Sequence, residues 1–475
     1  MPSKPASAAI AFVRPRAPLN PYLQNVPLNY IHLAAYLRER GHEALILDAV
    51  FDEITPKYID HVIRERGIRI AGIGCMTCEL PQALEEAARL KRAHQDVRIV
   101  FGGAHPSGDP GECLRSGVVD YVIVGEGEIA LTQLLDALRE GREPGNIRGL
   151  WKLAQGNVVA GGSAEVPDIC LLPRPAFDLL DLPRYYRLCS PWHFPKSPCA
   201  VQFITERGCP YQCSYCHELH TKKFRALPPQ EVLDQMEWLV REYGVREFMI
   251  VDDIFNFDLT RAKEICRGIV RRDLRIHLQF PNGLRGDCFD EELAGLLKQA
   301  GTHYIAIAIE TVSQRFQKLV RKNLKIDKAR RSIEWARQFG IEVCGFFMIG
   351  FPGETRQEVE ATLDFALSAP LDLILVSIVA PFKGTRLRTD IVSGNFGPIN
   401  SDALEALNQL FPVVHNPALP ADLLLRLQRR AYWRFYARPR PLMRLVAKIT
   451  SFRNFRKITH ALARRIWEPR TASVN

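Results

Sequence analysis

The sequence predicts an α/β protein with a Rossmann-like domain at residues 1–140, a partial (β/α)6 TIM-like barrel at residues 196–400 and a helical C-terminal region at residues 401–475. Two series of short β-branched segments alternate with amphipathic segments, a Gly- and Pro-rich stretch separates the two series, and the last 75 residues lack such segments. The chain has 475 residues, more than one compact core usually holds, so we expect several domains. Its 47% apolar and 24% charged residues are typical of a packed protein.

The first domain is predicted from five short apolar segments that alternate with helical patterns. The expected strands are residues 8–13, 44–50, 68–74, 97–101 and 121–124. The helical segments include residues 27–40, 80–94 and 129–138, and Gly41 stands where a helix C-terminal glycine belongs. Such alternation favours an open parallel sheet with helices on both faces, which is a Rossmann-like arrangement.

Residues 141–195 lose this alternation and are rich in Gly and Pro. Prolines favour extended or turn conformations, and the segment has seven of them, including those at positions 167, 173, 175, 183, 191 and 195. We interpret the segment as a linker that contains a short strand pair around residues 149–159.

Six strand-then-helix units follow before residue 400. The expected strands are residues 200–205, 247–251, 276–280, 304–309, 343–349 and 373–379. In the helix predicted over residues 231–243, the apolar side chains share one face, as a helix packed on a sheet requires. Six such units can form an incomplete barrel, whose chemistry is expected at the carboxyl ends of the strands.

The formal charge of +10 is concentrated at the end of the chain. Residues 423–470 contain 14 Lys and Arg and a single acid, Glu468, interleaved with Trp, Phe, Tyr and Leu. We favour a helical cap on the barrel with a solvated basic face, and the alternative is a surface helix that contacts anionic lipid. No nucleic-acid-binding module is recognisable, so no nucleic-acid partner is expected.

The N-terminus shows no cleavable apolar segment, and no uncharged run reaches the roughly 18–20 residues that span a bilayer. We therefore expect a cytoplasmic protein, with membrane association as the alternative that the basic tail raises. Most of the twelve cysteines are scattered, which is typical of buried thiols in a reducing compartment.

Cys209, Cys213 and Cys216 depart from that scatter. They form a CxxxCxxC motif that follows Gly208 and the first strand of the barrel, so three thiols project from one loop at the rim where chemistry is expected. Three thiols cannot complete the four-thiolate shell of an ordinary iron-sulfur or structural zinc site, so one metal position stays open. The alternative is three unrelated buried thiols.

This loop resembles that of the radical S-adenosylmethionine (SAM) superfamily. The resemblance implies that the three cysteines hold a 4Fe-4S cluster, whose fourth iron chelates SAM, and that reduction releases a 5′-deoxyadenosyl radical. It also implies that Tyr215, before the third cysteine, packs near the adenine.

Three acids at strand ends extend the resemblance toward SAM binding. Asp252 and Asp253 stand where many members carry Gly-Gly-Glu, and Glu310 lies in an Ile-Glu-Thr that is similar to the family's Ile-Glu-Ser/Thr. The resemblance implies that these acids contact SAM, and the alternative is that they cap strand ends. Residues 345–354 and 381–385 resemble two further family segments, with Lys383 where proline is common.

Glycine-rich loops follow two consecutive strands of the first domain, where backbone can approach a large ligand at the carboxyl edge. The residues singled out are Gly102, Gly103, His105, Pro106, Gly125, Glu126 and Gly127. Ahead of a CxxxCxxC domain they resemble the cobalamin-binding subclass of radical SAM enzymes, which implies that they bind cobalamin.

The Asp-x-His-x-x-Gly motif that supplies a lower cobalt ligand is absent from the sequence. We therefore expect cobalamin without His ligation, and His105 as part of a shape-determining loop. A domain that has lost its cofactor is the alternative. Cys75 and Cys78 form a CxxC without a second pair nearby, and we interpret them as small residues at a strand end.

Together these features predict an enzyme that uses a 4Fe-4S cluster, SAM and cobalamin to functionalise an unactivated carbon, with C-methylation as the first hypothesis. An oxidative cyclase or ring-rearranging enzyme is the alternative within the subclass. A cluster-bearing binding protein without catalytic activity is the alternative from another class. The expected partners are a small-molecule or lipid-like substrate and an external electron donor of the flavodoxin or ferredoxin type.

Overall fold

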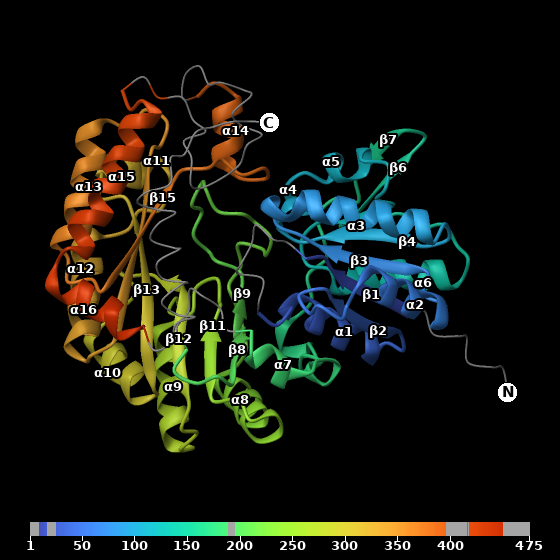
Figure 1. Ribbon diagram of the computed structural model, residues 1–475, viewed down its shortest axis with the longest axis horizontal. Coiled ribbons are helices and arrows are strands. Elements are labelled where there is room, and N and C mark those ends of the chain that lie inside the picture. The colour runs from blue at the N-terminus through green and yellow to red at the C-terminus, as the bar shows by residue number, and fades with distance from the viewer. Residues whose placement is uncertain (1–8, 17–24, 189–194, 396–415, 417, 450–475) are drawn as a thin grey trace. The chain divides into compact units, whose positions relative to one another are not determined.

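The computed structural model describes residues 9–16, 25–188, 195–395, 416 and 418–449 (Figure 1). The chain forms two compact units. The first contains Met1–Leu188 together with His217–Thr221 and Phe382–Thr385, and the second contains the remaining residues.

The first unit is built on a seven-stranded sheet of order β2-β1-β3-β4-β5-β6-β7. The strands are β1 Ala9–Arg14, β2 Glu43–Asp48, β3 Ile70–Gly74, β4 Arg98–Gly102, β5 Tyr121–Ile123, β6 Leu150–Ala154 and β7 Asn157–Val159. The first five strands are parallel, as predicted. The chain adds β2 on one side of β1 and then β3 on the other side, so the strand order switches between β1 and β3. Ligands of open α/β sheets bind beyond the carboxyl ends of strands at such a switch point.

The predicted strand pair around residues 149–159 is present as β6 and β7, but it does not lie in a separate linker. β6 pairs antiparallel with β5, and β7 pairs antiparallel with β6, so the hairpin extends the first sheet. The first unit accordingly continues to Leu188, whereas we expected a linker over residues 141–195.

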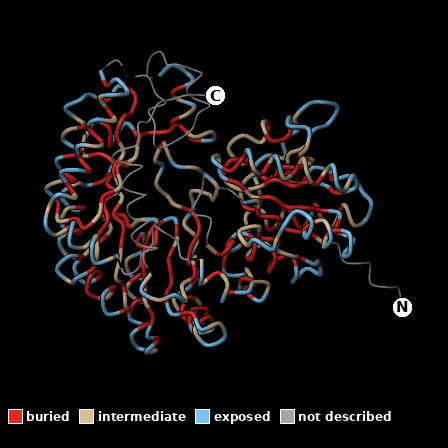
Figure 2. Tube along the Cα trace, viewed as in Figure 1, coloured by how far each residue is buried: buried red, intermediate tan, exposed pale blue. Residues whose placement is uncertain are grey.

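Helices cover both faces of this sheet. They are α1 Leu28–Glu39, α2 Pro56–Glu65, α3 Leu80–Ala93, α4 Ala104–Gly108, α5 Pro110–Arg115, α6 Glu128–Arg139 and α7 Leu182–Tyr186, with 3-10 turns η2 Thr77–Glu79, η3 Ile169–Leu171 and η4 Phe177–Leu179. One core packs α2, α3 and α5 on the sheet, and a second core packs α1 and α6 on the opposite face. The sheet is therefore buried between two helical layers (Figure 2).

The second unit contains six parallel strands whose order in the sheet follows the sequence. They are β8 Ala200–Phe203, β11 Glu247–Ile250, β12 His277–Leu284, β13 Thr302–Glu310, β14 Glu342–Ile349 and β15 Leu373–Ile378. A separate ladder pairs β9 Glu206–Arg207 with β10 Arg225–Ala226. Since β8 and β15 stand at opposite ends of the sheet, the predicted partial barrel is confirmed.

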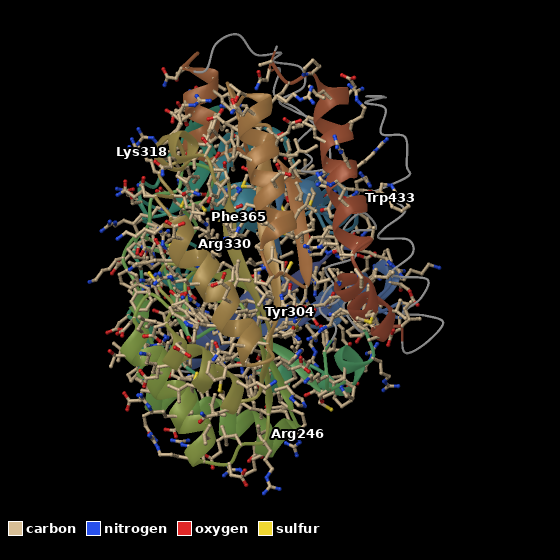
Figure 3. The ribbon with its side chains drawn as sticks, turned by 90° about the vertical axis from the view of Figure 1, so that its left-hand side faces the viewer. Arg246, Tyr304, Lys318, Arg330, Phe365 and Trp433 are labelled. Carbon is tan, nitrogen blue, oxygen red and sulfur yellow. The ribbon has the colours of Figure 1, made fainter. Side chains whose placement is uncertain are left out.

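The helices of this unit include α8 Pro229–Tyr243, α9 Leu259–Arg271, α10 Glu291–Gln299, α11 Gln314–Leu319, α12 Ile326–Gln338, α13 Arg356–Ser368 and α14 Arg386–Val392. Capping explains where α13 begins. The Thr355 side chain accepts from Glu358 N, and the Glu358 side chain accepts from Thr355 N, which together form a capping box. Arg330 on α12 lies 4.5 Å over the Phe365 ring of α13, so neighbouring helices are also joined on their outer sides (Figure 3).

Two C-terminal helices, α15 Ala421–Tyr436 and α16 Pro439–Ala447, confirm the helical nature of the described part of the tail. The Gln428 side chain donates to the Val376 carbonyl at 2.8 Å, and Val376 N donates to the Tyr432 hydroxyl at 2.9 Å. Because Val376 belongs to the end strand β15, α15 satisfies backbone groups that an edge strand would otherwise leave open. Residues 401–415 and 450–475 of the predicted region lie outside the described residues. Among the described residues, no helix has the length and apolar character needed to cross a bilayer.

Candidate active site

The cysteine motif lies on a loop that several strand ends hold in place. Gly208 precedes it with a φ of 93°, a conformation that glycine adopts without strain. Within the loop, Ser214 N donates to the Val320 carbonyl at 2.9 Å, and the Ser214 carbonyl accepts from Leu387 N at 2.7 Å. Lys222 Nζ donates to the Tyr211 carbonyl at 3.1 Å. The loop is therefore anchored at both halves before any ligand is considered.

The three thiols are more open than the buried structural thiols of the described chain. Cys209 and Cys213 are half-buried and Cys216 is exposed, whereas structural thiols such as Cys113 and Cys266 are fully buried. A hydrogen bond with the Cys216 thiol lowers the pKa of Cys213 to about 6. Open thiols on one loop, one of them readily ionised, suit metal ligation.

No three His, Cys, Asp or Glu side chains of the described residues surround a single point as one metal ion would require. A 4Fe-4S cluster makes a different demand, because its irons occupy separate corners and each thiolate binds its own iron. Three thiols spread along one loop therefore fit a cluster better than a mononuclear site.

An acidic network lies beneath the loop. Asp252 accepts from Thr205 N at 2.6 Å and from the Thr205 hydroxyl at 2.5 Å, so both its oxygens are engaged. Asp253 accepts from Gly208 N at 2.7 Å, directly before the motif. The structure therefore gives both acids a positioning role at the strand end, and their contact with SAM remains a prediction.

Glu206, which the sequence analysis did not single out, completes this network. Its Oε1 accepts from Ile254 N at 2.6 Å, and its Oε2 is buried without a hydrogen-bond partner among the described residues. Burial, together with the neighbouring Asp252, raises the pKa of Glu206 to about 9. Burial also raises the pKa of Asp252 to about 6, despite its two bonds from Thr205. The buried Arg261 acts on both acids and lowers their pKa values, so Glu206 is the acid of this pair that holds a proton at neutral pH.

Glu310 ends β13 at an irregularity of the ladder. It has a φ of 67°, which is unusual for a non-glycine residue, and the pairing with β14 shifts between Ala308 and Glu310. The buried Lys322 places its Nζ 3.4 Å from Glu310 Oε1. Lys322 also acts electrostatically on Cys213 and Cys216, so it links the cysteine loop to the predicted SAM acid.

A second buried cation, Arg285, lies directly after β12, and its Nη2 donates to the Lys322 carbonyl at 2.9 Å. Its guanidinium carbon lies 3.6 Å from the centroid of the Tyr211 ring, and its charge also acts on Cys213. The Asn256 side chain accepts from Arg285 N at 3.0 Å and donates to the Cys288 carbonyl at 2.5 Å. Sequence reasoning missed Arg285 and Lys322, because each reaches the motif from a distant loop.

Tyr215 packs against a buried apolar cluster that includes Phe316, Val320 and Phe351. The ring centroids of Tyr215 and Phe351 are 6.5 Å apart. The Tyr215 hydroxyl is buried and interacts with the Cys213 thiol. An aromatic ring at the cysteine loop fits the predicted contact with an adenosyl group.

In the first unit, the loops after β3, β4 and β5 are joined at the carboxyl edge of the sheet. His105 N donates to the Cys75 carbonyl at 3.2 Å, and Gly125 N donates to the Ser107 hydroxyl at 3.0 Å. Gly103 and Gly125 have φ values of 95° and 87°, which explains glycine at both. A Cβ on Gly102 would lie 3.9 Å from the Ile123 carbonyl oxygen, which is an ordinary van der Waals contact.

Glu126, Gly127 and Pro106 complete the predicted cobalamin residues. Glu126 and Pro106 are buried, and a Cβ on Gly127 would lie 3.3 Å from Leu33, so these three residues pack within the domain. By packing there, they support the loops at the carboxyl edge of the sheet. Direct contact of any of them with cobalamin remains a prediction.

His105 is buried, and both its ring nitrogens face protein groups. Nδ1 lies 3.2 Å from the Thr77 hydroxyl, and Nε2 lies 3.1 Å from Glu112 Oε2. Lys383 Nζ lies 2.7 Å from the same Glu112 oxygen, which gives the unusual lysine a partner within the first unit. Burial lowers the pKa of His105. With both nitrogens engaged, His105 fits a shape-determining role and not cobalt ligation.

Comparison with known proteins identifies both domains. The model of the radical SAM superfamily matches residues 203–366, and that of the B12 binding domain matches residues 19–135. An uncharacterized methyltransferase of Pyrococcus horikoshii is 30% identical over 422 residues, covering 88% of this chain and 89% of that protein. The cytidylyl-2-hydroxyethylphosphonate methyltransferase of Streptomyces wedmorensis is 26% identical over 425 residues, covering 78% of each chain.

A relative with another activity also matches: the anaerobic magnesium-protoporphyrin IX monomethyl ester cyclase of Rubrivivax gelatinosus is 24% identical, covering 85% of this chain and 72% of that protein. Among solved structures, the radical SAM methyltransferase TsrM of Kitasatospora setae, with cobalamin and a 4Fe-4S cluster bound, superposes with a TM-score of 0.75 at 20% identity. It covers 96% of this chain and 100% of that chain, which confirms the predicted fold over both units. The matches to the radical SAM and B12 binding domain models confirm the cofactor set predicted from the sequence.

Proposed function

We propose that this protein, since it belongs to the cobalamin-binding radical SAM enzymes, methylates an unactivated carbon of a small molecule. The observation that carries the proposal is the presence, in one chain, of an open three-thiol loop at the rim of a partial barrel and a B12 binding domain. Two relatives named as methyltransferases favour methyl transfer over the alternatives. When bound, the cofactors supply reductive cleavage of SAM and a transferable methyl group.

Cys209, Cys213 and Cys216 would hold the 4Fe-4S cluster. The protein's own contribution is to keep this loop in place and to balance its charge. Asp253 fixes the backbone before the first thiol through Gly208 N. Lys322 and Arg285 bring positive charge to thiols that must be ionised as ligands. In a partly dry site this compensation is worth more than it would be in water.

Tyr215 and Glu310 are the predicted SAM residues that the geometry supports best. The Tyr215 ring lies at the cysteine loop, and Lys322 contacts the Glu310 carboxylate at the long distance of 3.4 Å. Asp252 and Asp253 already serve Thr205 and Gly208, so we assign them to positioning the loop. This division separates residues that can meet a ligand from residues that hold the loop.

In the first unit, Gly102, Gly103 and Gly125 would leave the edge of the sheet low enough for the flat face of a corrin. His105 would support this edge from below through Thr77 and Glu112. We propose an external electron donor of the flavodoxin or ferredoxin type and a cytoplasmic location, both of which extend the family assignment.

A test follows from the difference between methyl transfer and cyclisation. Anaerobically reconstituted protein with bound corrinoid is incubated with reductant and SAM that carries a deuterated methyl group. A methyltransferase moves the label onto the corrinoid, which mass spectrometry of the extracted cofactor detects. If the enzyme forms 5′-deoxyadenosine while the corrinoid never gains the label, the proposal fails and the cyclase alternative stands.

A further inference from the structure

Helix α16 turns its basic side chains toward the barrel. Arg440 Nε lies 3.1 Å and Arg444 Nε 3.6 Å from Asp372 Oδ1, and Lys448 Nζ lies 2.5 Å from Glu342 Oε1. Asp372 is fully buried. Arg440, Arg444 and Lys448 are four residues apart, so they share one helical face, and their ion pairs hold that face inward. Our expectation of a solvated basic face is therefore wrong in part for α16, because the buried Asp372 and the partly buried Glu342 pair with these charges at the strand starts.

The opposite face of α16 is apolar and exposed. Leu442, Met443, Val446 and Ile449 are 46%, 64%, 55% and 37% exposed. The usual surface helix has the reverse arrangement, with its apolar stripe on the core and its charges in water. Trp433 on α15 is exposed as well (Figure 3). Five of the fourteen exposed large apolar side chains of the described chain thus lie between residues 433 and 449, which is a concentration that marks an interaction surface.

The neighbouring helix α15 contributes positive charge. Arg426, Arg430 and Arg434 are exposed and four residues apart, so they too share one face. Arg426 pairs with Asp422 and Arg434 lies 3.7 Å from Asp364, and both acids are exposed. In sequence, residues 423–470 contain 14 Lys and Arg and only one acid. A second copy of the chain would bring two such basic surfaces together, and their repulsion opposes that pairing. An anionic surface complements them.

We propose that α16 binds an anionic membrane surface, with Leu442, Met443 and Val446 among the lipid head groups and the basic side chains of α15 against the lipid charge. An apolar helical face flanked by arginines is the arrangement of helices that lie in a membrane interface. The ion pairs to Asp372 and Glu342 fix the orientation of α16, so its apolar face points outward before any membrane is bound.

The test is co-sedimentation of the reconstituted holoenzyme with vesicles of phosphatidylcholine alone or mixed with phosphatidylglycerol. The wild type should bind the mixed vesicles roughly tenfold more tightly than the neutral ones, and added salt should weaken this binding. The variant Leu442→Gln/Met443→Gln/Val446→Gln should lose roughly tenfold in binding to the mixed vesicles.

A matched control replaces three exposed apolar residues elsewhere, as Leu171→Gln/Leu319→Gln/Val392→Gln, and should bind as the wild type does. Both triple variants should form 5′-deoxyadenosine at the wild-type rate, which shows that each is folded. Equal binding of the wild type and the α16 variant overturns the proposal, as does a wild type that binds neither kind of vesicle. A loss of dimers on ultracentrifugation, without a change in vesicle binding, overturns it in favour of a second copy.

Discussion

Replacement of Glu354 by Gln should remove a pH-dependent loss of stability. The Glu354 side chain is fully buried after β14, and its Oε2 accepts from Gly350 N at 2.6 Å and from Phe351 N at 3.0 Å. Its Oε1 has no hydrogen-bond partner among the described residues. Burial outweighs the two backbone bonds and raises the pKa of Glu354 from 4.5 to about 8.

The sign of the effect follows from this raised pKa. Below pH 4.5 the carboxyl group is protonated in both the folded and the unfolded chain, so its contribution to stability is fully present. As the pH rises toward 8, the unfolded chain releases the proton and the folded chain retains it, so the free energy of unfolding falls. At about 1.4 kcal/mol per pH unit, the loss between pH 4.5 and pH 8 is about 4 kcal/mol. Glutamine imitates the protonated acid and cannot ionise, so Glu354→Gln should lack this loss.

Urea unfolding at several pH values, followed by hydrogen exchange in peptides that cover β14, measures the free energy for the second unit. The expected result is a difference between Glu354→Gln and the wild type that grows in favour of the variant as the pH rises. Glu360→Gln, which changes a partly exposed acid paired with Arg356, is the matched control and should leave the pH dependence unchanged. Parallel curves for Glu354→Gln and the wild type would refute the reasoning.

Three further outcomes are expected. Lys322→Met removes a buried cation beside the cysteine loop, so it should lower the midpoint potential of the cluster in an anaerobic redox titration. We expect a shift of about 60 mV, the value of a tenfold change in a one-electron equilibrium. Lys318→Met, which changes an exposed lysine, should leave the potential unchanged. Tyr432→Phe removes the hydroxyl that accepts from Val376 N and should lower the free energy of unfolding by about 1–3 kcal/mol in urea titrations, and an unchanged midpoint would contradict its role at the sheet edge. Asp252→Ala leaves two donors of Thr205 without an acceptor and should lower both iron content and stability, whereas a loss of SAM affinity alone would show that Asp252 is a ligand.

Much of the fold could be predicted because its strands are short β-branched runs with a clear alternation. The strand predicted at residues 343–349 is β14 Glu342–Ile349, for example. The strand pair at residues 149–159 was also found in the sequence, but its attachment to β5 was not, because pairing between distant strands leaves no local pattern.

The candidate site shows the same division. The cysteine spacing located the loop, and strand ends located Asp252 and Glu310, since parallel strands bring their carboxyl ends together. The sequence could not reveal that Thr205 engages both oxygens of Asp252, or that Lys322 reaches the thiols. Likewise the charge pattern of α16 indicated a basic face but could not show which acids it meets.

The central claim is that Cys209, Cys213 and Cys216 hold the cluster that cleaves SAM. The most direct measurement is the 5′-deoxyadenosine formed from SAM by anaerobically reconstituted protein under strong reductant, together with its iron content. The variant Cys209→Ala/Cys213→Ala/Cys216→Ala should lose both, while Cys78→Ala/Cys170→Ala, which changes two exposed thiols elsewhere, should keep both. Unchanged 5′-deoxyadenosine in the first variant, or none in the wild type, would contradict the account.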